Sequence, residues 1–554
     1  MANLFNSIIA KKPKSNAFNL SYDKKISLKF GQLIPIHLQE TIPGDIFRGK
    51  TQVMMRLAPM LAPVMHQVEL YCHFFFVPNR ILWDNWEAFI TGQDTNSGIP
   101  EPPYILLSAA KVENGSLGDH LGLPSSDITQ VTYTDGTPAE PERQFNALPF
   151  AAYQRIWWEY YRDENLEFPT VRTRSLTLPD GVVTPPGDGS YTDLHQIRYR
   201  AWQKDYFASA LPFAQQGAEM LIPFGFDEDV PVYTDVDGSG DFIRSKFANV
   251  DGTHPATNQT LQSLGTTGNL LLAQDVAPGA IDAEGSGLMA RTSGLTLGSG
   301  SVEELRTAFR LQEWLEKNAR GGTRYVESIL SHFGVRVKDY RLDRPEYIGG
   351  GKNLVQISEV LQTAEPADPM TQTPLATMAG HGISAGYAGT YNYRAPEHGF
   401  IVGIMSVRPK PAYYMGVPRH FLQRKDRLDY YWPSFAHLGE QPIIETELLY
   451  DGLQIAIDGE AAEFGYTPRY AEYRKNYSTV AGDFNTSLDF WHLGRKFPSM
   501  PLLNNDFTRV NSPDITTEMD RIFAVQDGTD YFWAHIVHDI KAIRPMPRFA
   551  IPRT

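Results

Sequence analysis

The sequence holds only one cysteine, Cys72, in 554 residues. An internal disulfide is therefore excluded, and so are most metal sites built from cysteine. The sequence also lacks any run of about 20 consecutive apolar residues, so no membrane-spanning helix is predicted. The short apolar run at residues 4–10 is followed, not preceded, by lysines, which differs from the layout of a secretory signal. We therefore expect synthesis and assembly in a reducing cytoplasm.

Motifs for catalysis and metal binding are also scarce. There is no nucleophile-elbow serine, no zinc signature and no Gly-x-Gly-x-x-Gly loop. The stretch Gly349–Lys352 matches a phosphate loop only weakly, because the second glycine and the Ser or Thr after the lysine are missing. His535 and His538 stand three apart on a predicted strand, so they point to opposite faces and cannot share one ion. We predict no catalytic residue, no metal site and no cofactor.

Negative charge dominates the composition, with a formal net charge of −14. Such a balance argues against a chain that binds nucleic acid over its whole surface. The two ends differ from the body: residues 1–30 carry six lysines against Asp23 alone, and four cations after Ile540 meet no acid. Basic ends would suit contact with a packaged polyanion, and the alternative is that charged termini serve only solubility.

Residues 64–77 give the clearest secondary-structure signal. Every second side chain is apolar, which is the period of a β-strand with one buried face. The predicted buried face consists of Val68, Leu70, Cys72, Phe74 and Phe76. Pro78 ends the strand, and Asn79 is placed to cap a helix that Gly92 ends. That helix would carry an apolar stripe of Leu82, Trp86, Phe89 and Ile90.

Strand patterns dominate both ends of the chain. Alternating residues predict strands from Lys24 onward and over Phe47–Leu57, before the strand at residues 64–77. The nearly continuous apolar run Phe400–Arg408 is typical of a strand buried on both faces. A final strand begins at Phe532, and we expect the first and last strands to lie near each other.

Helical patterns occupy the middle of the chain. Aromatic residues at three-to-four spacing predict a helix over residues 150–161, and we interpret this stripe as core packing and not as a base-stacking surface. The sequence Ser301–Glu304 is a capping box that opens a second helix, which ends at Gly321. A further short helix ends at Gly334.

The segment at residues 227–300 differs from the rest in composition. It holds ten acids, eleven glycines, many threonines and serines, and no tryptophan. Such a stretch cannot bury much apolar surface by itself. We expect either a disordered loop or an insertion that becomes ordered only against copies of itself.

Several longer stretches closely resemble the major capsid proteins of the Microviridae, above all those of the gokushovirus-like branch. These are small tailless icosahedral bacteriophages with circular single-stranded DNA. The matching stretches are Leu57–His66, Phe75–Glu87, Asn318–Tyr325, Ser331–Val335, Arg344–Gly351, Tyr391–Phe400 and Phe532–Pro547. The likeness covers nearly the full chain outside residues 98–145 and 227–300.

The resemblance and the strand pattern together predict a mainly β fold. We expect a single eight-stranded antiparallel jelly roll of the viral-capsid type, with long, partly helical insertions. The expected divisions are a basic flexible arm at 1–20, a discontinuous core at 21–78 and 380–554 with further strands within 190–226 and 335–379, a helical and loop insertion at 79–190, the acidic insertion at 227–300, and a helical pair at 301–334.

The resemblance implies a structural role in a virion. Pentamers would close into a small T=1-type icosahedral shell around circular single-stranded DNA, with internal scaffolding and minor virion proteins as partners, assembled in the cytoplasm of a bacterial host. The insertion at 227–300 would form a threefold protrusion that contacts a host surface receptor. The candidates for facing the DNA are Lys11, Lys12, Lys14, Lys541, Arg544, Arg548 and Arg553.

One further cluster mixes basic and aromatic side chains. Its candidate residues are Arg419, Arg424, Lys425, Arg427 and Trp432, with tyrosines on both sides. Such a cluster can hold single-stranded DNA by phosphate contacts and base stacking. It can equally form a subunit interface, where Tyr, Trp and Arg are enriched. We favour the interface, because a shell offers more subunit contact than DNA-facing area.

Two other classes of protein share parts of these patterns. A glycan-binding β-sandwich would have the same fold class, and sugar binding by the isolated monomer would favour it. A hydrolase would need a close pair of inward carboxylates, which the sequence does not single out.

Overall fold

The computed structural model describes most of the chain and divides it into two compact units. One unit comprises Met1–Gln216 and Glu316–Thr554, and the other Gly217–Leu315. The described residues are 14–92, 98–107, 112–124, 143–167, 177–183, 192–217, 232–234, 245–248, 271–274, 288–290, 302–322, 324–363, 376–422, 424, 426–450, 462–510, 519–525 and 529–549.

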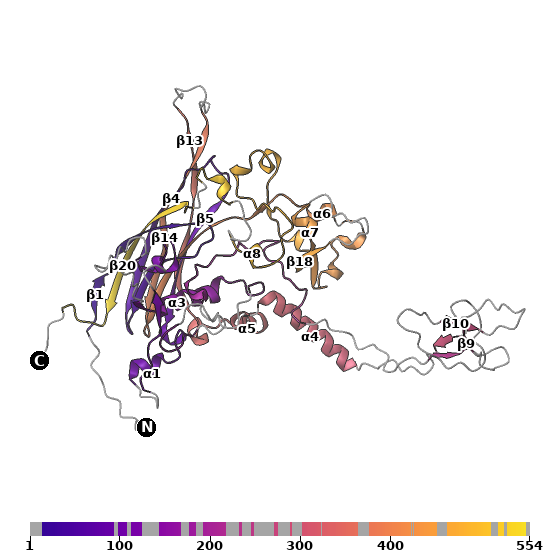
Figure 1. Ribbon diagram of the computed structural model, residues 1–554, viewed down its shortest axis with the longest axis horizontal. Coiled ribbons are helices and arrows are strands. Elements are labelled where there is room, and N and C mark those ends of the chain that lie inside the picture. Colours follow the sequence, from indigo (N-terminus) through magenta and orange to yellow (C-terminus); the bar gives the residue numbers. More distant parts are fainter. Residues whose placement is uncertain are drawn as a thin grey trace, which may run out of the picture. The chain divides into compact units, whose positions relative to one another are not determined.

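Ten strands of the first unit form one large, curled antiparallel sheet (Figure 1). The order along the sheet is β1-β20-β4-β14-β12-β5-β15-β3, with β2 also beside β20 and β13 beside β14. The strands are β1 (Asn16–Asn19), β2 (Tyr22–Leu28), β3 (Ile34–Thr41), β4 (Ile46–Leu57), β5 (Val68–Pro78), β12 (Glu346–Leu354), β13 (Gln356–Leu361), β14 (Met378–Arg394), β15 (Gly399–Pro409) and β20 (Phe532–Arg544). The mainly β prediction is confirmed, and so is the proximity of the first and last strands, because β1 and β2 both pair with β20.

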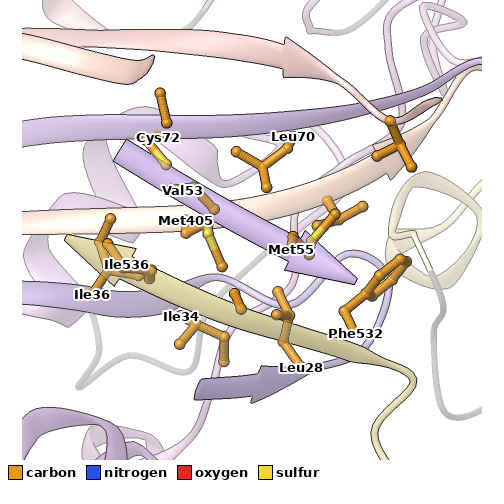
Figure 2. Close-up of a cluster of buried hydrophobic side chains, with 14 of the residues drawn as sticks. Leu28, Ile34, Ile36, Val53, Met55, Leu70, Cys72, Met405, Phe532 and Ile536 are labelled. Carbon is orange, nitrogen blue, oxygen red and sulfur yellow. The ribbon is translucent and has the colours of Figure 1, made fainter. Parts of the chain in front are cut away.

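The main core lies inside the curl of the sheet. Figure 2 shows Val53 and Met55 of β4, Cys72 of β5, Met405 of β15 and Ile536 of β20 in one buried cluster. Alternation along each strand explains the cluster, since every second residue of β4 and β20 is buried. The predicted inner face of β5 is also confirmed, from Val68 to Phe76.

A second core covers the outer side of β5 and β15. Phe75 and Val77 of β5 and Phe400, Val402 and Ile404 of β15 point away from the main core and pack against the helical insertion. The insertion contributes α3 (Leu148–Ile156) and the π-helical turn Trp157–Tyr161. The helix predicted at residues 150–161 and its role in core packing are therefore confirmed. The continuous apolar run in β15 follows from burial on both faces.

The helix predicted after Pro78 is broken into two pieces. A 3₁₀ turn covers Asn79–Ile81, and α1 covers Trp86–Thr91. Asn79 does not cap a helix, because it is the first residue of the 3₁₀ turn and Pro78 occupies the cap position. Gly92 ends α1 in the left-handed conformation, as predicted. Ile90 was placed in the apolar stripe but is 48% exposed, so the buried stripe is shorter than expected.

The run Gly349–Gly351 belongs to β12 and is not a phosphate loop. β12 pairs with β5 along one edge and with β14 along the other, and it joins the two halves of the sheet. A Cβ atom on Gly350 would lie 2.5 Å from the Cys72 carbonyl oxygen, and one on Gly351 would lie 2.7 Å from the Ala388 carbonyl oxygen. The glycines therefore permit a close backbone approach at the bend of the sheet.

The remaining elements lie in shorter segments. The helices are α2 (Leu117–Leu121), α4 (Val302–Gly321), α5 (Tyr325–Phe333), α6 (Arg419–Leu422), α7 (Glu445–Leu448) and α8 (Asn505–Thr508). Strand pairs are β6 (Tyr104–Leu107) with β7 (Arg143–Asn146), β17 (Glu440–Ile444) with β18 (Glu463–Pro468), and β16 (Ala412–Tyr413) with β19 (Ser478–Thr479). The predicted helix pair is confirmed as α4 and α5, with Gly334 left-handed at the end of α5. Ser301, the predicted cap of α4, lies outside the described residues.

One region differs from the sequence prediction, and a second region is described only in part. The segment 192–217, where a core strand was expected, forms a 3₁₀ turn and isolated bridges, and contributes the buried side chains of Trp202, Tyr206 and Phe207 instead. In the second unit, β8 (Val232–Thr234) pairs with β11 (Leu288–Ala290), and β9 (Ser245–Ala248) pairs with β10 (Leu271–Gln274). The rest of the acidic insertion at 227–300 lies outside the described residues.

Candidate functional surfaces

Strand β4 turns a row of charged side chains to solvent. Arg48, Lys50 and Arg56 occupy the exposed positions of its alternating pattern. The antiparallel register places Lys541 of β20 opposite Arg48, and Asp539 opposite Lys50. Directly opposed residues share one face of a sheet. The charges of both strands therefore gather on the outer side of the sheet, with the main core behind them.

We call this surface the basic face. Its exposed cations on β2, β4, β14 and β20 are Lys25, Arg48, Lys50, Arg56, Arg394 and Lys541, and its acids are Asp23 and Asp539. Positive charge thus predominates here although the whole chain carries −14. A concentration of one sign on one face attracts polyanions. The sequence prediction missed the contribution of β4, although alternating cations within Phe47–Leu57 were a visible signal.

The predicted DNA-facing residues at the two ends have different surroundings. Lys541 is exposed on the basic face, Lys14 is exposed just before β1, and Arg548 is exposed just after β20. Lys11, Lys12 and Arg553 lie outside the described residues.

Arg544 braces the subunit internally. Its guanidinium donates to the Glu40 carbonyl at 2.7 Å, lies 3.3 Å from an Asp45 carboxylate oxygen, and covers the ring of Phe47. Burial raises the pKa of Asp45, and the charge of Arg544 opposes that rise. The side chain of Arg544 is only 16% exposed in the subunit, and its contact with DNA stays a prediction.

Arg419 of the basic and aromatic cluster is buried. It donates to Glu447 Oε1 at 2.9 Å and to the Pro442 carbonyl at 2.7 Å. Tyr206 donates to the other carboxylate oxygen of Glu447 at 2.9 Å. Burial raises the pKa of Glu447, and Arg419 counteracts this effect. With 7% of its surface exposed, Arg419 holds α6 against β17 and α7 within the subunit.

Arg424 also has internal partners. It donates to the Asp429 carbonyl at 2.6 Å and lies 3.4 Å from Glu472. Its guanidinium stacks near the rings of Tyr430 and Tyr473, at 5.4 and 5.3 Å. The guanidinium of Arg424 therefore packs against the two aromatic rings, and its side chain is only 14% exposed.

The exposed part of this cluster is mainly aromatic. We define the aromatic patch as Tyr430, Tyr431, Trp432 and Tyr473, which are each about half exposed. Trp432 is fixed by a hydrogen bond of 2.8 Å from its Nε1 to the carbonyl of Arg427, whose own side chain is exposed. Lys425 lies outside the described residues. Exposed apolar patches on soluble proteins mark interaction sites.

The two histidines of β20 lie on opposite faces of the strand. His535 is exposed and lies 3.1 Å from Asp23, whereas His538 is buried and contacts Thr51, so the two imidazoles do face opposite sides. Within the described ranges, no group of three or more His, Cys, Asp or Glu side chains could hold a metal ion. Over the same ranges, no helix is long and apolar enough to cross a bilayer.

The described residues thus combine one large β-sheet, a face of the sheet on which positive charge predominates, and an exposed aromatic patch outside the sheet. Comparison with known proteins identifies the class as a capsid protein. Residues 7–554 match the family model described as capsid protein (F protein), and the chain belongs to this family. The resemblance to Microviridae capsid proteins is confirmed.

Three relatives extend along nearly the whole chain. Capsid protein VP1 of Chlamydia phage 1 is 32% identical over 100% of this chain and 98% of its own length. VP1 of Bdellovibrio phage phiMH2K is 35% identical over 97% and 95%. VP1 of Spiroplasma virus 4 is 29% identical over 94% and 92%. Membership of this family makes the protein a structural, non-enzymatic component of a virion that assembles into an oligomeric shell.

Proposed function

We propose that this capsid protein forms an eight-stranded jelly roll that builds a T=1-type icosahedral shell around circular single-stranded DNA. The strand order supports the jelly roll. One half of the curled sheet reads β2-β20-β4-β14 and the other β3-β15-β5-β12. This is the interleaved order produced by two Greek keys, in which most successive strands change from one four-stranded sheet to the other and β5 and β12 are neighbours in one of them. Tyr22 of β2 lies 2.8 Å from His37 of β3, which brings the two ends of the curl together.

The basic face carries the DNA part of the proposal. It is exposed, it lies on a strand framework that keeps its cations in fixed positions, and its charge is opposite to that of the chain as a whole. Phosphate contacts by Lys and Arg need no base recognition, so one subunit surface can accept any genome sequence. Lys14 and the other basic residues of both termini would extend this contact.

The aromatic patch carries the assembly part. In a closed shell each subunit meets neighbours around fivefold and threefold axes through heterologous contacts. Tyr and Trp are suited to such interfaces because they bury much area with little loss of side-chain entropy. We propose that the patch contacts a second copy, first within pentamers, with internal scaffolding and minor virion proteins as helpers in the host cytoplasm.

The acidic insertion is proposed to project outward and to contact a host surface receptor. Removal of residues 235–287 would keep β8 and β11, which pair with each other. We expect this deletion to leave shells that form with unchanged sedimentation, while attachment to host cells is lost. Loss of folding in the deleted subunit would contradict the proposal that the insertion is peripheral.

The central test is the salt dependence of single-stranded DNA binding. The triple substitution Arg48→Gln, Lys50→Gln and Arg56→Gln removes three cations from the basic face. The slope of log affinity against log salt should fall by about 2, because each lost phosphate contact on a single strand removes roughly 0.7.

A matched control removes the same charge elsewhere. Arg336, Lys338 and Arg341 are exposed between α5 and β12, away from β4 and β20. Their replacement by Gln should leave the slope unchanged. Equal slopes for the two triple variants would show that net charge alone, and not the basic face, governs binding.

A further inference from the structure

A cleft of about 520 Å³ opens on the outer side of β5, β12 and β15. Its walls include His73 and Tyr347 from the sheet, Tyr161 from the helical insertion, and Arg200 and Arg408. These side chains point away from the main core, because the inward residues of the same strand are Cys72 and Phe74. The cleft and the basic face therefore lie on opposite sides of that core.

Two guanidiniums in the cleft share one aromatic ring. The Cζ atoms of Arg200 and Arg408 lie 4.0 and 5.1 Å from the centre of the Tyr71 ring. Arg200 donates to Ser406 Oγ at 2.8 Å, and Arg408 donates to Tyr71 Oη at 3.1 Å. Burial and the charge of Arg408 lower the pKa of Arg200 to about 10. Both cations are thus held close together with neutral hydrogen-bond acceptors.

The acids in the cleft pair with other cations. Asp163 binds Lys204, and Glu327 lies 3.2 Å from Arg324, whose Nε is 4.0 Å from Glu164. Among the described residues, no carboxylate forms an ion pair with Arg200 or Arg408. Placing two like charges in a partly buried cleft is unfavourable unless an anion compensates them. The carboxylate of Glu69, which accepts from the Tyr71 hydroxyl, offsets part of the charge of Arg200 and Arg408. Arg162 adds a third cation to the lining, so the cleft keeps a net positive charge around these arginines.

The wall beside the arginines is aromatic and uncharged. The ring of His73 stacks on Tyr161 at 5.9 Å and meets the edge of Tyr347 at 5.8 Å. Its Nδ1 lies 2.7 Å from the Tyr161 hydroxyl. Burial, then Arg200 and Arg408, lower the pKa of His73 to about 4, so the imidazole is neutral near pH 7. Tyr347 stands at the mouth with 49% of its surface exposed.

We propose that this cleft binds a nucleoside monophosphate, with the phosphate between Arg200 and Arg408 and the base against Tyr347. Guanidinium groups match phosphate oxygens in pairs, and aromatic faces stack on bases of any sequence. The volume lies within the range of small-molecule sites, roughly 300–1,000 Å³. A carboxylate from another subunit would fill only a small part of it.

A phosphate with an attached base could come from a free nucleotide or from a nucleotide within a DNA strand. The geometry favours the free nucleotide, because a strand on the basic face is separated from the cleft by the main core. The site is therefore independent of the proposed DNA contact, and its failure would leave that contact untouched.

Calorimetric titration of the purified protein with dAMP, inorganic phosphate, deoxyadenosine and a pentanucleotide tests the proposal. dAMP should bind one per subunit and about tenfold more tightly than phosphate or deoxyadenosine, because only dAMP makes both contacts. Equal affinity for deoxyadenosine, or no binding, would overturn the phosphate site. Displacement of dAMP by a more tightly bound pentanucleotide would overturn the assignment to a free nucleotide.

Substitutions then locate the site. Arg408→Gln should weaken dAMP and phosphate alike by about tenfold or more, and Arg408→Lys should recover part of the loss, since the charge returns without the bidentate fork. Tyr347→Leu should weaken dAMP about tenfold and leave phosphate unchanged. This exposed position keeps the test valid if the arginine variants fold poorly. Lys50→Gln on the basic face, across the main core from the cleft, removes the same charge and is the control; a loss of dAMP binding as large as that of Arg408→Gln would overturn the site.

Discussion

The two halves of the curled sheet differ in their outer sides: one is exposed and charged, and the other is apolar and buried. β4 and β20 expose charged residues to solvent, whereas β5 and β15 bury Phe75, Val402 and their neighbours under the helical insertion. The inner sides of both halves form one core. The subunit therefore has one open, charged face and one covered face that anchors its insertions.

The largest effect is expected inside the curl. Phe74→Ala should lower the free energy of unfolding by about 3–5 kcal/mol, because the ring is fully buried and leaves a cavity. Phe421→Ala, at a phenylalanine that is 75% exposed, is the matched control and should change it by less than about 0.5 kcal/mol. Urea unfolding measures both. Similar values for the two variants would mean that the Phe74 ring is not packed in the core of the subunit.

The junction between the halves should be the next most sensitive place. Gly350→Ala would place a methyl group 2.5 Å from the Cys72 carbonyl oxygen, at a cost of about 1–3 kcal/mol. Gly118→Ala in α2 is the control, since its nearest atom would be 3.4 Å away and the change should be neutral or slightly stabilising. A tolerated alanine at Gly350 would show that the sheet can part at β12 without loss.

Two buried histidines link the halves and should make the subunit sensitive to acid. Burial lowers the pKa of His37 well below its usual value and that of His538 to about 4, with their rings 5.1 Å apart. In the unfolded chain both pKa values return to about 6.5. Below that pH the unfolded chain therefore binds more protons than the folded chain does. Stability should be full above about pH 6.5 and fall toward pH 4, by up to about 1.4 kcal/mol per pH unit for each histidine.

Unfolding titrations at several pH values measure this slope. His538→Gln should reduce the slope by the share of one histidine, whereas His420→Gln, at an exposed position, should leave it unchanged. A slope that is insensitive to His538→Gln would mean that other groups control acid unfolding.

The smallest effect on stability is expected on the basic face. Lys50→Gln should change the free energy of unfolding by less than about 0.5 kcal/mol, because exposed charged residues contribute little. The same substitution should weaken DNA binding. A loss of stability comparable to that of Gly350→Ala would show that the charges of this face belong to the folding of the sheet.

Much of the fold was predictable because local periodicity and burial coincide in its strands. The inner face of β5, the continuous burial of β15 and the helix at residues 150–161 all followed from the spacing of apolar residues. The break between the 3₁₀ turn, which ends at Ile81, and α1, which begins at Trp86, could not be predicted from spacing. The choice between one helix and these two pieces depends on packing around Leu82 and Trp83.

The candidate surfaces were less predictable than the fold. The basic and aromatic cluster was correctly located in sequence, but its cations and its rings have different roles. Arg419 and Arg424 turn inward because Glu447 and Glu472, distant in sequence, compensate their charges. No spacing rule within residues 413–432 could indicate these partners.

By itself, the sequence determined the membership in a capsid family, the mainly β character and which side of each strand is apolar. These follow from motifs and from a period of two that each strand carries within itself. Only the tertiary structure decided which cations remain at the surface and why β12 contains three consecutive glycines. It also decided that Arg200 and Arg408 both pack against the ring of Tyr71. Each of these depends on strands and loops brought together from distant parts of the chain, where charge and space are shared between residues that no local pattern connects.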